Sequence, residues 1–359
     1  MTAVDPLLAD TRPILALTLG DVAGIGPEVS VAAAAAPQTL RICRPVLVGD
    51  PEVVRRAAQQ LRLPQAIDVV DGPVPSADPD RIACWSPRST VGVRGRIELP
   101  RDLADVPPGR IDGRAGQAAY GWLVAAARAA LDGQIGGIVT APLNKKALEA
   151  AGLDYPGHTE ILADECGVRD FAMMLYVPPG HGIGGPAGLG VAHVTLHTSL
   201  RSVPGLLSME RVFETIGLID RFLRRAGCAS PRIGVCALNP HAGESGRFGD
   251  EEARLIAPAV ERARADSLDA RGPIPADALL RQAVGGEFDG VAAMYHDQGH
   301  IALKLVAFNR AVNVTLGLPI VRTSPSHGTA FDIAGQGQAD AGGMRAAIET
   351  AVRLIGATR

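Results

Sequence analysis

The chain has 359 residues, of which 47% are hydrophobic and 20% charged, as in a globular protein with a well-buried core. Its 35 Lys and Arg residues nearly balance 38 Asp and Glu residues, and only 4% of residues are aromatic. We therefore expect no nucleic-acid partner. No segment approaches the roughly 20 apolar residues of a membrane helix, so no membrane partner is expected either.

The first residues and the cysteines indicate a cytoplasmic protein. The stretch MTAVDPLLADTRP lacks the basic and then apolar segments of a secretory signal. The five cysteines form no CxxC pair, and most lie in apolar segments, so we expect them to be reduced.

Strand and helix patterns alternate in the first part of the chain. We expect strands at 13–19, 45–50 and 135–143, and helices at 28–36, 51–63 and 116–133. Residues 71–110 are rich in Pro and Gly, and we expect them to be irregular with one strand.

The second part continues this alternation. It predicts strands at 188–197, 232–241 and 288–297 and helices at 209–227 and 344–356. Such alternation favours an α/β fold with a largely parallel sheet. No charged linker marks a domain boundary.

Three of the expected strands carry a histidine at or just beyond their C-terminal ends: His197, His241 and His296. Ligands bind at that edge of open parallel sheets. Three imidazoles are a suitable donor set for zinc or another divalent metal, although each could instead hydrogen-bond its own neighbours. Asp277 and Asp297 are acids that could orient an imidazole or act as a base.

Two further segments favour an anion site. His158 and Thr159 precede a helical pattern, where they could bind an anion or where Thr159 could simply cap the helix. Lys304, Arg310 and Arg322 interrupt an apolar run and could bind phosphate or carboxylate. The alternative is that their long stems reach water, which fits Arg310 best.

Two glycine-rich stretches raise the question of a nucleotide. GDVAGIGPE fails the Rossmann fingerprint, because Val29 stands where glycine is needed and Pro27 lacks an amide donor. SHGTAFDIAGQG, residues 326–337, has small residues that would let a flat ligand approach the backbone, unless it is only a turn-rich loop.

Taken together, the motifs resemble the 4-hydroxythreonine-4-phosphate dehydrogenase family, including its branch acting on 4-phospho-D-threonate or 4-phospho-D-erythronate. The motifs are GDVAGIGPE, TAPLNKKAL, GHTE, LNPHAGE, GPIPAD, MYHDQGH and VNVTLGLPIVRTSPSHGTAFDIAGQG. GIGPE and HGTAFDIAGQG are more distantly similar to isocitrate and isopropylmalate dehydrogenases. VAHVTLH, YHDQGHI and KLVAFN look more like the threonate branch.

The resemblance implies a two-domain α/β fold of the isopropylmalate dehydrogenase type, with the active site in the cleft between the domains and no Rossmann fold. Residues 1–140 with 316–359 would form the cofactor-side domain. Residues 141–315 would form the domain for metal, substrate and dimerisation in a homodimer.

The resemblance also implies roles for single residues. The metal (Zn, Mg or Co) would be held by His197, His241 and His296. The substrate would be held by His158, Thr159, Lys304, Asn313 and Arg322, and NAD, or alternatively NADP, by His327, Gly328, Thr329 and Asp332. Candidates for proton transfer are Lys145, Asp277 and Lys304.

The expected activity is NAD- and metal-dependent oxidative decarboxylation of a phosphorylated hydroxy acid. One alternative is a dihydrodiol dehydrogenase for an aromatic-derived dicarboxylate, in which Arg322 and Lys304 would bind a carboxylate. Another is a binding protein without catalysis. Pro325 and Ser326 stand where the family commonly has Val-Asp before His-Gly-Thr, and we expect this departure to alter how the cofactor loop packs.

Overall fold

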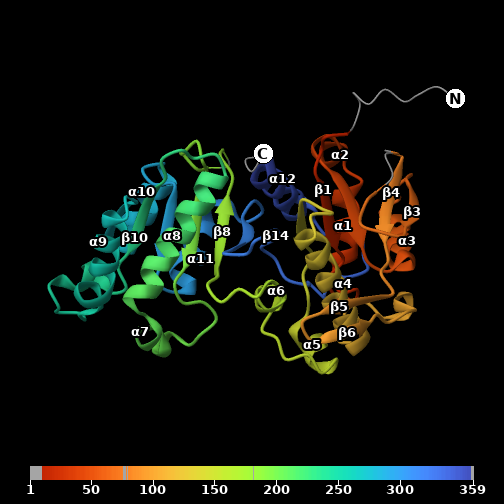
Figure 1. The fold of residues 1–359 in the computed structure, drawn as a ribbon, viewed down its shortest axis with the longest axis horizontal. Helices are drawn as coiled ribbons and strands as arrows, with labels where there is room; N and C mark the ends of the chain where they lie inside the picture. The colour runs from red at the N-terminus through yellow and green to blue at the C-terminus, as the bar shows by residue number, and fades with distance from the viewer. Residues whose placement is uncertain (1–9, 76–77, 79, 181, 357–359) are drawn as a thin grey trace.

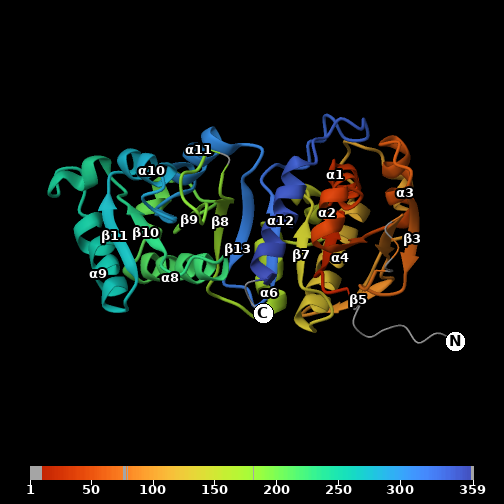
Figure 2. The ribbon, with the colours of Figure 1, turned by 90° about the horizontal axis from the view of Figure 1, so that it is seen from above.

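The computed structural model describes residues 10–75, 78, 80–180 and 182–356. Twelve strands form one sheet along which the molecule is elongated (Figure 1, Figure 2). In spatial order they are β11 (Asp269–Ile274), β10 (Arg232–Cys236), β12 (Gly290–Ala293), β9 (Leu189–His193), β8 (Ala172–Val177), β13 (Val312–Leu316), β14 (Val321–Pro325), β7 (Gly137–Thr140), β1 (Ile14–Thr18), β2 (Arg44–Val48), β4 (Arg81–Trp85) and β3 (Ala66–Val70).

The sheet is parallel at both ends and antiparallel in the middle. The antiparallel pairs are β9 with β8, β8 with β13, and β13 with β14, and every other neighbouring pair is parallel. The predicted α/β fold with a largely parallel sheet is therefore confirmed. The tight turn from β13 to β14 contains Gly317 at φ +91°, where a Cβ atom would lie 2.3 Å from the Asp170 carbonyl oxygen.

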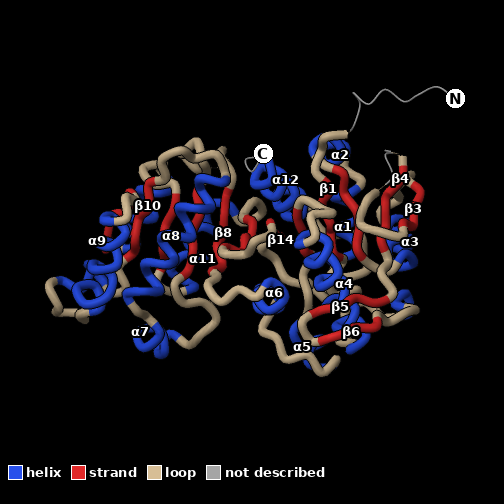
Figure 3. Tube along the Cα trace, in the orientation of Figure 1, coloured by secondary structure: helices blue, strands red, loops and turns tan. Residues whose placement is uncertain are grey.

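Helices cover both faces of the sheet (Figure 3). The half from β14 to β3 carries α1 (Gly26–Ala34), α2 (Pro37–Ile42), α3 (Pro51–Gln60), α4 (Gly113–Leu131), α5 (Lys145–Ala150), α6 (His158–Cys166) and α12 (Gly342–Gly356). The half from β11 to β13 carries α7 (Val203–Leu206), α8 (Met209–Arg225), α9 (Ala257–Ala265), α10 (Ala276–Val284) and α11 (His296–Ala307).

Helix α8 shows how local sequence produces these elements. Ser208 caps it by accepting a hydrogen bond from the Arg211 amide, and the helix buries Val212, Ile216, Ile219 and Leu223 on one face. Among the described helices, none is long and apolar enough to cross a membrane.

Some predicted boundaries are wrong. The strand expected to reach His197 ends at His193, and those expected to reach His241 and to include His296 end at Cys236 and Ala293. His241 has φ 52°, a left-handed conformation that no strand accommodates, and His296 begins a helix. The described part of residues 71–110 contains three strands instead of one: β4, β5 (Ser89–Gly92) and β6 (Gly95–Glu98), the last two forming a hairpin.

The GDVAGIGPE turn between β1 and α1 uses its amides internally. The amides of Asp21, Gly24 and Ile25 donate to the carbonyls of Pro142, Asp21 and Thr329 respectively. A Cβ atom at Gly26 would lie 2.1 Å from the Leu19 carbonyl oxygen, and at Gly20 it would lie 2.2 Å from that of Pro142. These glycines therefore permit close backbone packing.

The expected domain boundaries fall at the end of β7 and before Leu316, the last residue of β13. Helices α5 and α6, which follow β7, pack against α4. The division into two domains at these residues stays a prediction.

The buried carboxyl of Asp21 predicts a pH-dependent stability. Asp21 is fully buried, Oδ1 accepts from the Ala23 amide and Oδ2 has no partner, so burial raises its pKa to about 6. In an unfolded chain the carboxyl releases this proton near its ordinary pKa of 3.8. The free energy of unfolding should therefore fall by up to about 3 kcal/mol as the pH rises from about 4 to about 6.

Denaturant unfolding at several pH values measures this loss. Asp21→Asn, which imitates the protonated carboxyl, should remove the loss and be at least as stable as the parent at neutral pH. The exposed Asp154, changed to Asn, serves as the control. An unchanged pH profile in Asp21→Asn would contradict the prediction.

Candidate active site

A hollow of about 350 Å³ lies where several strands of the sheet end. Thr140 is the last residue of β7, and Ser326, His327 and Gly328 follow β14 directly. The carboxyl ends of sheet strands are the usual place for a ligand site. Its polar lining comes from both halves of the sheet and includes Thr140, Lys145, His158, Thr159, Glu160, His197, His296, His300, Lys304, Asn313, Arg322, Ser326 and His327.

Arg322 of β14 is a buried cation in the wall of this hollow. It is 4% exposed, and its Nε and Nη2 atoms donate to Thr140 Oγ1 at 3.2 and 2.7 Å. Its Nη1 atom donates to Thr315 Oγ1 at 3.1 Å. Burial lowers its pKa to about 10, and no carboxylate of the described residues lies within ion-pair distance of it.

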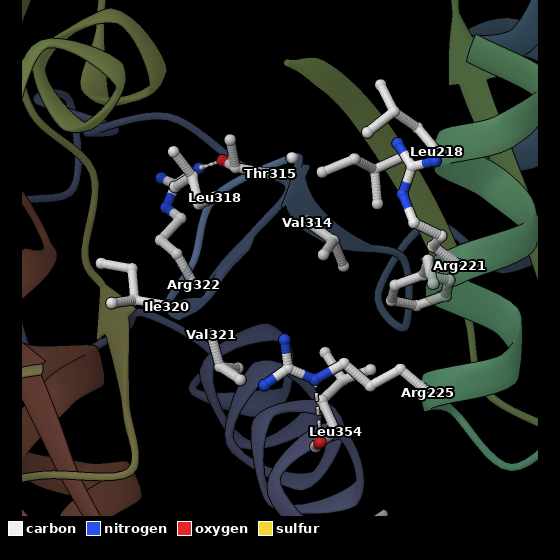
Figure 4. A pocket seen from close by; sticks show the side chains of 13 residues that line it. Leu218, Arg221, Arg225, Val314, Thr315, Leu318, Ile320, Val321, Arg322 and Leu354 are labelled. Atoms are coloured by element: carbon white, nitrogen blue, oxygen red, sulfur yellow. Dashed lines mark hydrogen bonds between the residues drawn. The ribbon is translucent and has the colours of Figure 1, made fainter. Parts of the chain in front are cut away.

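Arg322 also borders a second hollow of about 210 Å³ on another side of the β13–β14 hairpin. Figure 4 shows this hollow, with Arg221 and Arg225 reaching toward it from α8. The Arg322 side chain thus borders both hollows. An unpaired guanidinium in this position suits the planar recognition of a phosphate or carboxylate.

His158 and Thr159 form the first turn of α6. His158 donates from Nε2 to the Ala141 carbonyl at 3.1 Å, and its burial beside Arg322 holds its pKa well below the ordinary value. The residue that caps α6 is Gly157, so the alternative of Thr159 as the cap is wrong. The free amides of this helix start add a favourable environment for an anion.

Lys145, Lys304 and Asn313 complete the polar wall. Lys145 begins α5, and the Lys304 Nζ atom of α11 donates to the Ser326 carbonyl at 3.4 Å. Asn313 donates from Nδ2 to the Pro325 carbonyl at 3.2 Å, whereas its buried Oδ1 atom has no partner. Glu160 is the only carboxylate among the described lining residues, so the hollow favours an anionic ligand.

Four histidines cluster at one side of the hollow. The ring centroids of His197 and His296 are 5.8 Å apart, and those of His296 and His300 are 3.8 Å apart with nearly parallel planes. Nδ1 of His300 lies 3.0 Å from Nε2 of His193. Nδ1 of His296 lies 2.6 Å from Asp297 Oδ1, which orients its Nε2 as a free ligand atom.

Burial lowers the pKa of three of these rings. Burial, with the nearby imidazoles as a smaller cause, lowers the pKa of His193 to about 4 and that of His300 to about 2. Burial also lowers the pKa of the more exposed His197, helped by Lys145. Neutral imidazoles are the form that binds a metal or accepts a hydrogen bond.

Several predicted residues lie outside the lining of this hollow. His241 is exposed in a turn after β10, and Asp277 is exposed in the first turn of α10. Thr329 and Asp332 follow the lining residues His327 and Gly328 but are not among them. Among the described residues, no group of three or more His, Cys, Asp or Glu side chains is placed to hold a metal ion. The chain thus brings His197 and His296 together, but not His241.

Sequence reasoning missed four side chains that shape the site: His193, His300, Thr140 and Thr315. His300 could have been found from its spacing, since it lies four residues after His296 and so on the same helix face. The two threonines carry no such signal, because only the pairing of strands brings their hydroxyls to Arg322.

Comparison with known proteins agrees with this geometry. Residues 41–351 match the family model "Pyridoxal phosphate biosynthetic protein PdxA". A 4-hydroxythreonine-4-phosphate dehydrogenase of Desulfosudis oleivorans is 43% identical over 95% of this chain and 96% of its own. A D-threonate 4-phosphate dehydrogenase of Pectobacterium atrosepticum is also 43% identical, over 95% and 99%.

A solved structure gives the same result for the fold. The 4-hydroxythreonine-4-phosphate dehydrogenase of Klebsiella pneumoniae superposes with a TM-score of 0.82 at 41% identity, covering 96% of this chain and all of that one. The family model and the alignments with these relatives each cover most of the chain. The chain therefore belongs to the PdxA family.

Proposed function

We propose that this protein is a cytoplasmic dehydrogenase that oxidises and decarboxylates a phosphorylated hydroxy acid, with NAD and a divalent metal. The substrate is 4-hydroxythreonine 4-phosphate or a 4-phospho-threonate or -erythronate. The observation that carries the proposal is Arg322, a buried cation without a carboxylate partner that faces the same hollow as His197 and His296. Relatives with both substrate names are equally similar to this chain, so identity does not choose between them.

The phosphate and carboxylate of such a substrate fit the charges of the hollow. Arg322, Lys304 and the start of α6 at His158 and Thr159 supply donors, and Lys145 adds a further cation. The hollow lies between the two halves of the sheet, which supports our proposal of two domains, 1–140 with 316–359 and 141–315, around a cleft. The internally bonded amides of the β1–α1 turn argue against pyrophosphate binding of the Rossmann kind there.

The residues present fit a divalent metal in part. His197 and His296 are neighbouring imidazoles at the hollow, and Asp297 orients the second of them. The third proposed ligand, His241, lies elsewhere on the same chain, so we propose that a second copy of the chain supplies it. When bound, the metal would polarise the substrate hydroxyl and stabilise the enolate charge that decarboxylation leaves.

A second copy also accounts for an apolar surface on α11. Ile301, Leu305 and Phe308 are 57%, 83% and 65% exposed and recur on one helix face, although such side chains are usually buried. Leu200 and Leu206 are exposed on the segment that follows His197. We propose a homodimer formed through this α11 face, next to the hollow.

For NAD we propose the segment that begins at His327. Gly328 is exposed at the hollow, and a Cβ atom there would meet nothing within 4 Å, so a ligand has room to approach the backbone. The Nε2 atom of His327 is buried without a partner. Thr329 and Asp332 continue this segment, and when bound NAD would accept a hydride from the substrate.

The chain's own residues would then position the substrate and move one proton. Arg322, Lys304 and Asn313 would hold the acid so that the carbon bearing the hydroxyl faces the cofactor. The hydroxyl proton would pass to a base, for which Lys145 and Lys304 line the hollow, whereas Asp277 does not. The C–C bond to the carboxylate then breaks, CO2 leaves, and the resulting enolate takes up a proton.

The activity is tested with a panel of phosphorylated four-carbon hydroxy acids, NAD and a divalent metal. NADH formation should occur with at least one member of the panel and should stop when a chelator is added. His296→Ala should lower the affinity for the metal alone, measured by calorimetry, because it removes one imidazole ligand. Oxidation of an aromatic cis-dihydrodiol dicarboxylate instead of the panel, or activity that resists the chelator, would contradict the proposal.

Replacing Arg322 should separate stability from binding. Arg322→Met removes a buried unpaired charge, so the free energy of unfolding should rise by about 1–3 kcal/mol in the absence of ligand. Inorganic phosphate should raise the melting temperature of the parent chain but not of this variant. Arg221→Met, at the other hollow, is the matched control and should respond to phosphate like the parent (Figure 4).

The homodimer is tested with Leu305→Glu. A charge in the centre of the α11 face should convert the dimer to a monomer in analytical ultracentrifugation and reduce activity, while the melting temperature of the monomer shows that it is folded. Val91→Glu, at a residue 62% exposed on β5, is the control and should remain dimeric. A monomeric parent chain would refute the proposed dimer.

A further inference from the structure

The buried pair of His193 and His300 has no part in the function proposed above. His193 ends β9 and is 2% exposed, and His300 of α11 is 6% exposed and lines the hollow. Their rings are joined by a hydrogen bond of 3.0 Å between Nδ1 of His300 and Nε2 of His193. Buried polar pairs of this kind fix the side chains that they connect.

The contact between His193 and the Met173 carbonyl indicates which nitrogen of each ring carries the hydrogen. Nδ1 of His193 lies 3.3 Å from the Met173 carbonyl, which can only accept, so we assign the hydrogen of the neutral ring to this nitrogen. In a neutral ring the Nε2 atom of His193 is then an acceptor, and Nδ1 of His300 donates to it. The Nε2 atom of a neutral His300 is therefore left as a bare acceptor.

This acceptor is available to a ligand. Nε2 of His300 has no hydrogen-bond partner among the described residues. The His300 ring is held by its hydrogen bond to His193 and by stacking on the nearly parallel ring of His296. Gly299 lets α11 lie this close to β9, because a Cβ atom there would be 2.8 Å from Nε2 of His193.

A fixed neutral acceptor complements the cations of the hollow. In their charged forms Lys145, Lys304 and Arg322 are donors only, and they suit the anionic oxygens of a ligand. A hydroxyl hydrogen of the ligand needs an acceptor instead, and Nε2 of a neutral His300 is one, in a lining that also contains the Glu160 carboxylate and the hydroxyls of Thr159 and Ser326. A phosphorylated acid with a hydroxyl besides the one that is oxidised matches these cations and this acceptor.

We propose that His300 is a specificity-determining residue that accepts a hydrogen bond from the substrate hydroxyl that is not oxidised. His193 is the positioning residue that fixes the required tautomer of His300 through the Met173 carbonyl. In D-threonate 4-phosphate the hydroxyl in question is the one at C2. The inference rests on the proposed function, since it names the substrate class that the same site selects.

The test compares D-threonate 4-phosphate with 3-hydroxy-4-phosphobutanoate, which lacks the C2 hydroxyl. The parent enzyme should prefer the first by about tenfold or more in kcat/KM, because the second leaves the acceptor unpaired. His300→Leu should abolish this preference by lowering kcat/KM for the first compound about tenfold more than for the second. An equal loss on both compounds would mean a merely structural role and would overturn the proposal.

Two variants of His193 test its positioning role. His193→Gln keeps an acceptor for His300 Nδ1 and should retain the preference for the C2 hydroxyl, whereas His193→Leu should reduce it. The double variant His193→Leu with His300→Leu removes both partners of the buried imidazole–imidazole hydrogen bond, and of the groups bonded to the pair only the Met173 carbonyl loses a donor. It should melt close to the parent and lack the preference, and a double variant that kept the preference would overturn the proposal.

Two readouts do not need turnover. Nitrogen-15 NMR of the histidine side chains should show Nε2 of His300 unprotonated and Nδ1 protonated, with His300→Leu providing the assignment, and the opposite tautomer would overturn the proposal. Calorimetric Kd values for the same two compounds repeat the comparison by binding. If the parent oxidises neither compound, the proposed function fails. A difference between the two Kd values that His300→Leu abolishes would still support the role of His300. Equal Kd values in the parent would refute that role.

Discussion

The antiparallel pairing of β13 with β14 is the constraint on which the rest of the structure depends. This hairpin joins the two halves of the sheet, so residues distant in the sequence meet where its strands end. It places Thr315 and Arg322 on adjacent strands, and β7 on the other side adds Thr140. The guanidinium is therefore fixed by two hydroxyls instead of a carboxylate, and its charge remains available to a ligand.

Such an arrangement is unfavourable for folding and favourable for binding. Removing a cation from water without a counter-ion costs free energy, which is why burial lowers the pKa of Arg322. The surrounding core stabilises the fold enough to hold it there. Local conflicts of this kind are typical of functional sites, where a ligand supplies the missing charge.

The four clustered histidines show how environment differentiates one residue type. His197 and His296 lie toward the opening, where a free ring nitrogen can meet a metal, whereas His193 and His300 are buried and paired. The deeper pair connects the hollow to a backbone carbonyl of β8. The depth of each ring, set by α11 lying against β9, decides between a ligand and a fixed acceptor.

The sequence by itself determined the α/β class, most helices and the strand-ends at which the site lies, because periodicity and turn residues are local signals. Its motifs also named most lining residues, among them His158, Lys304 and Arg322. Only the tertiary structure decided that β8, β13 and β14 pair antiparallel, that His193 instead of His197 ends β9, and that His241 lies apart from the other two histidines. Strand order and the contact between α11 and β9 are long-range properties, which no local pattern encodes, and they alone bring the His193–His300 pair and the hydroxyls around Arg322 together.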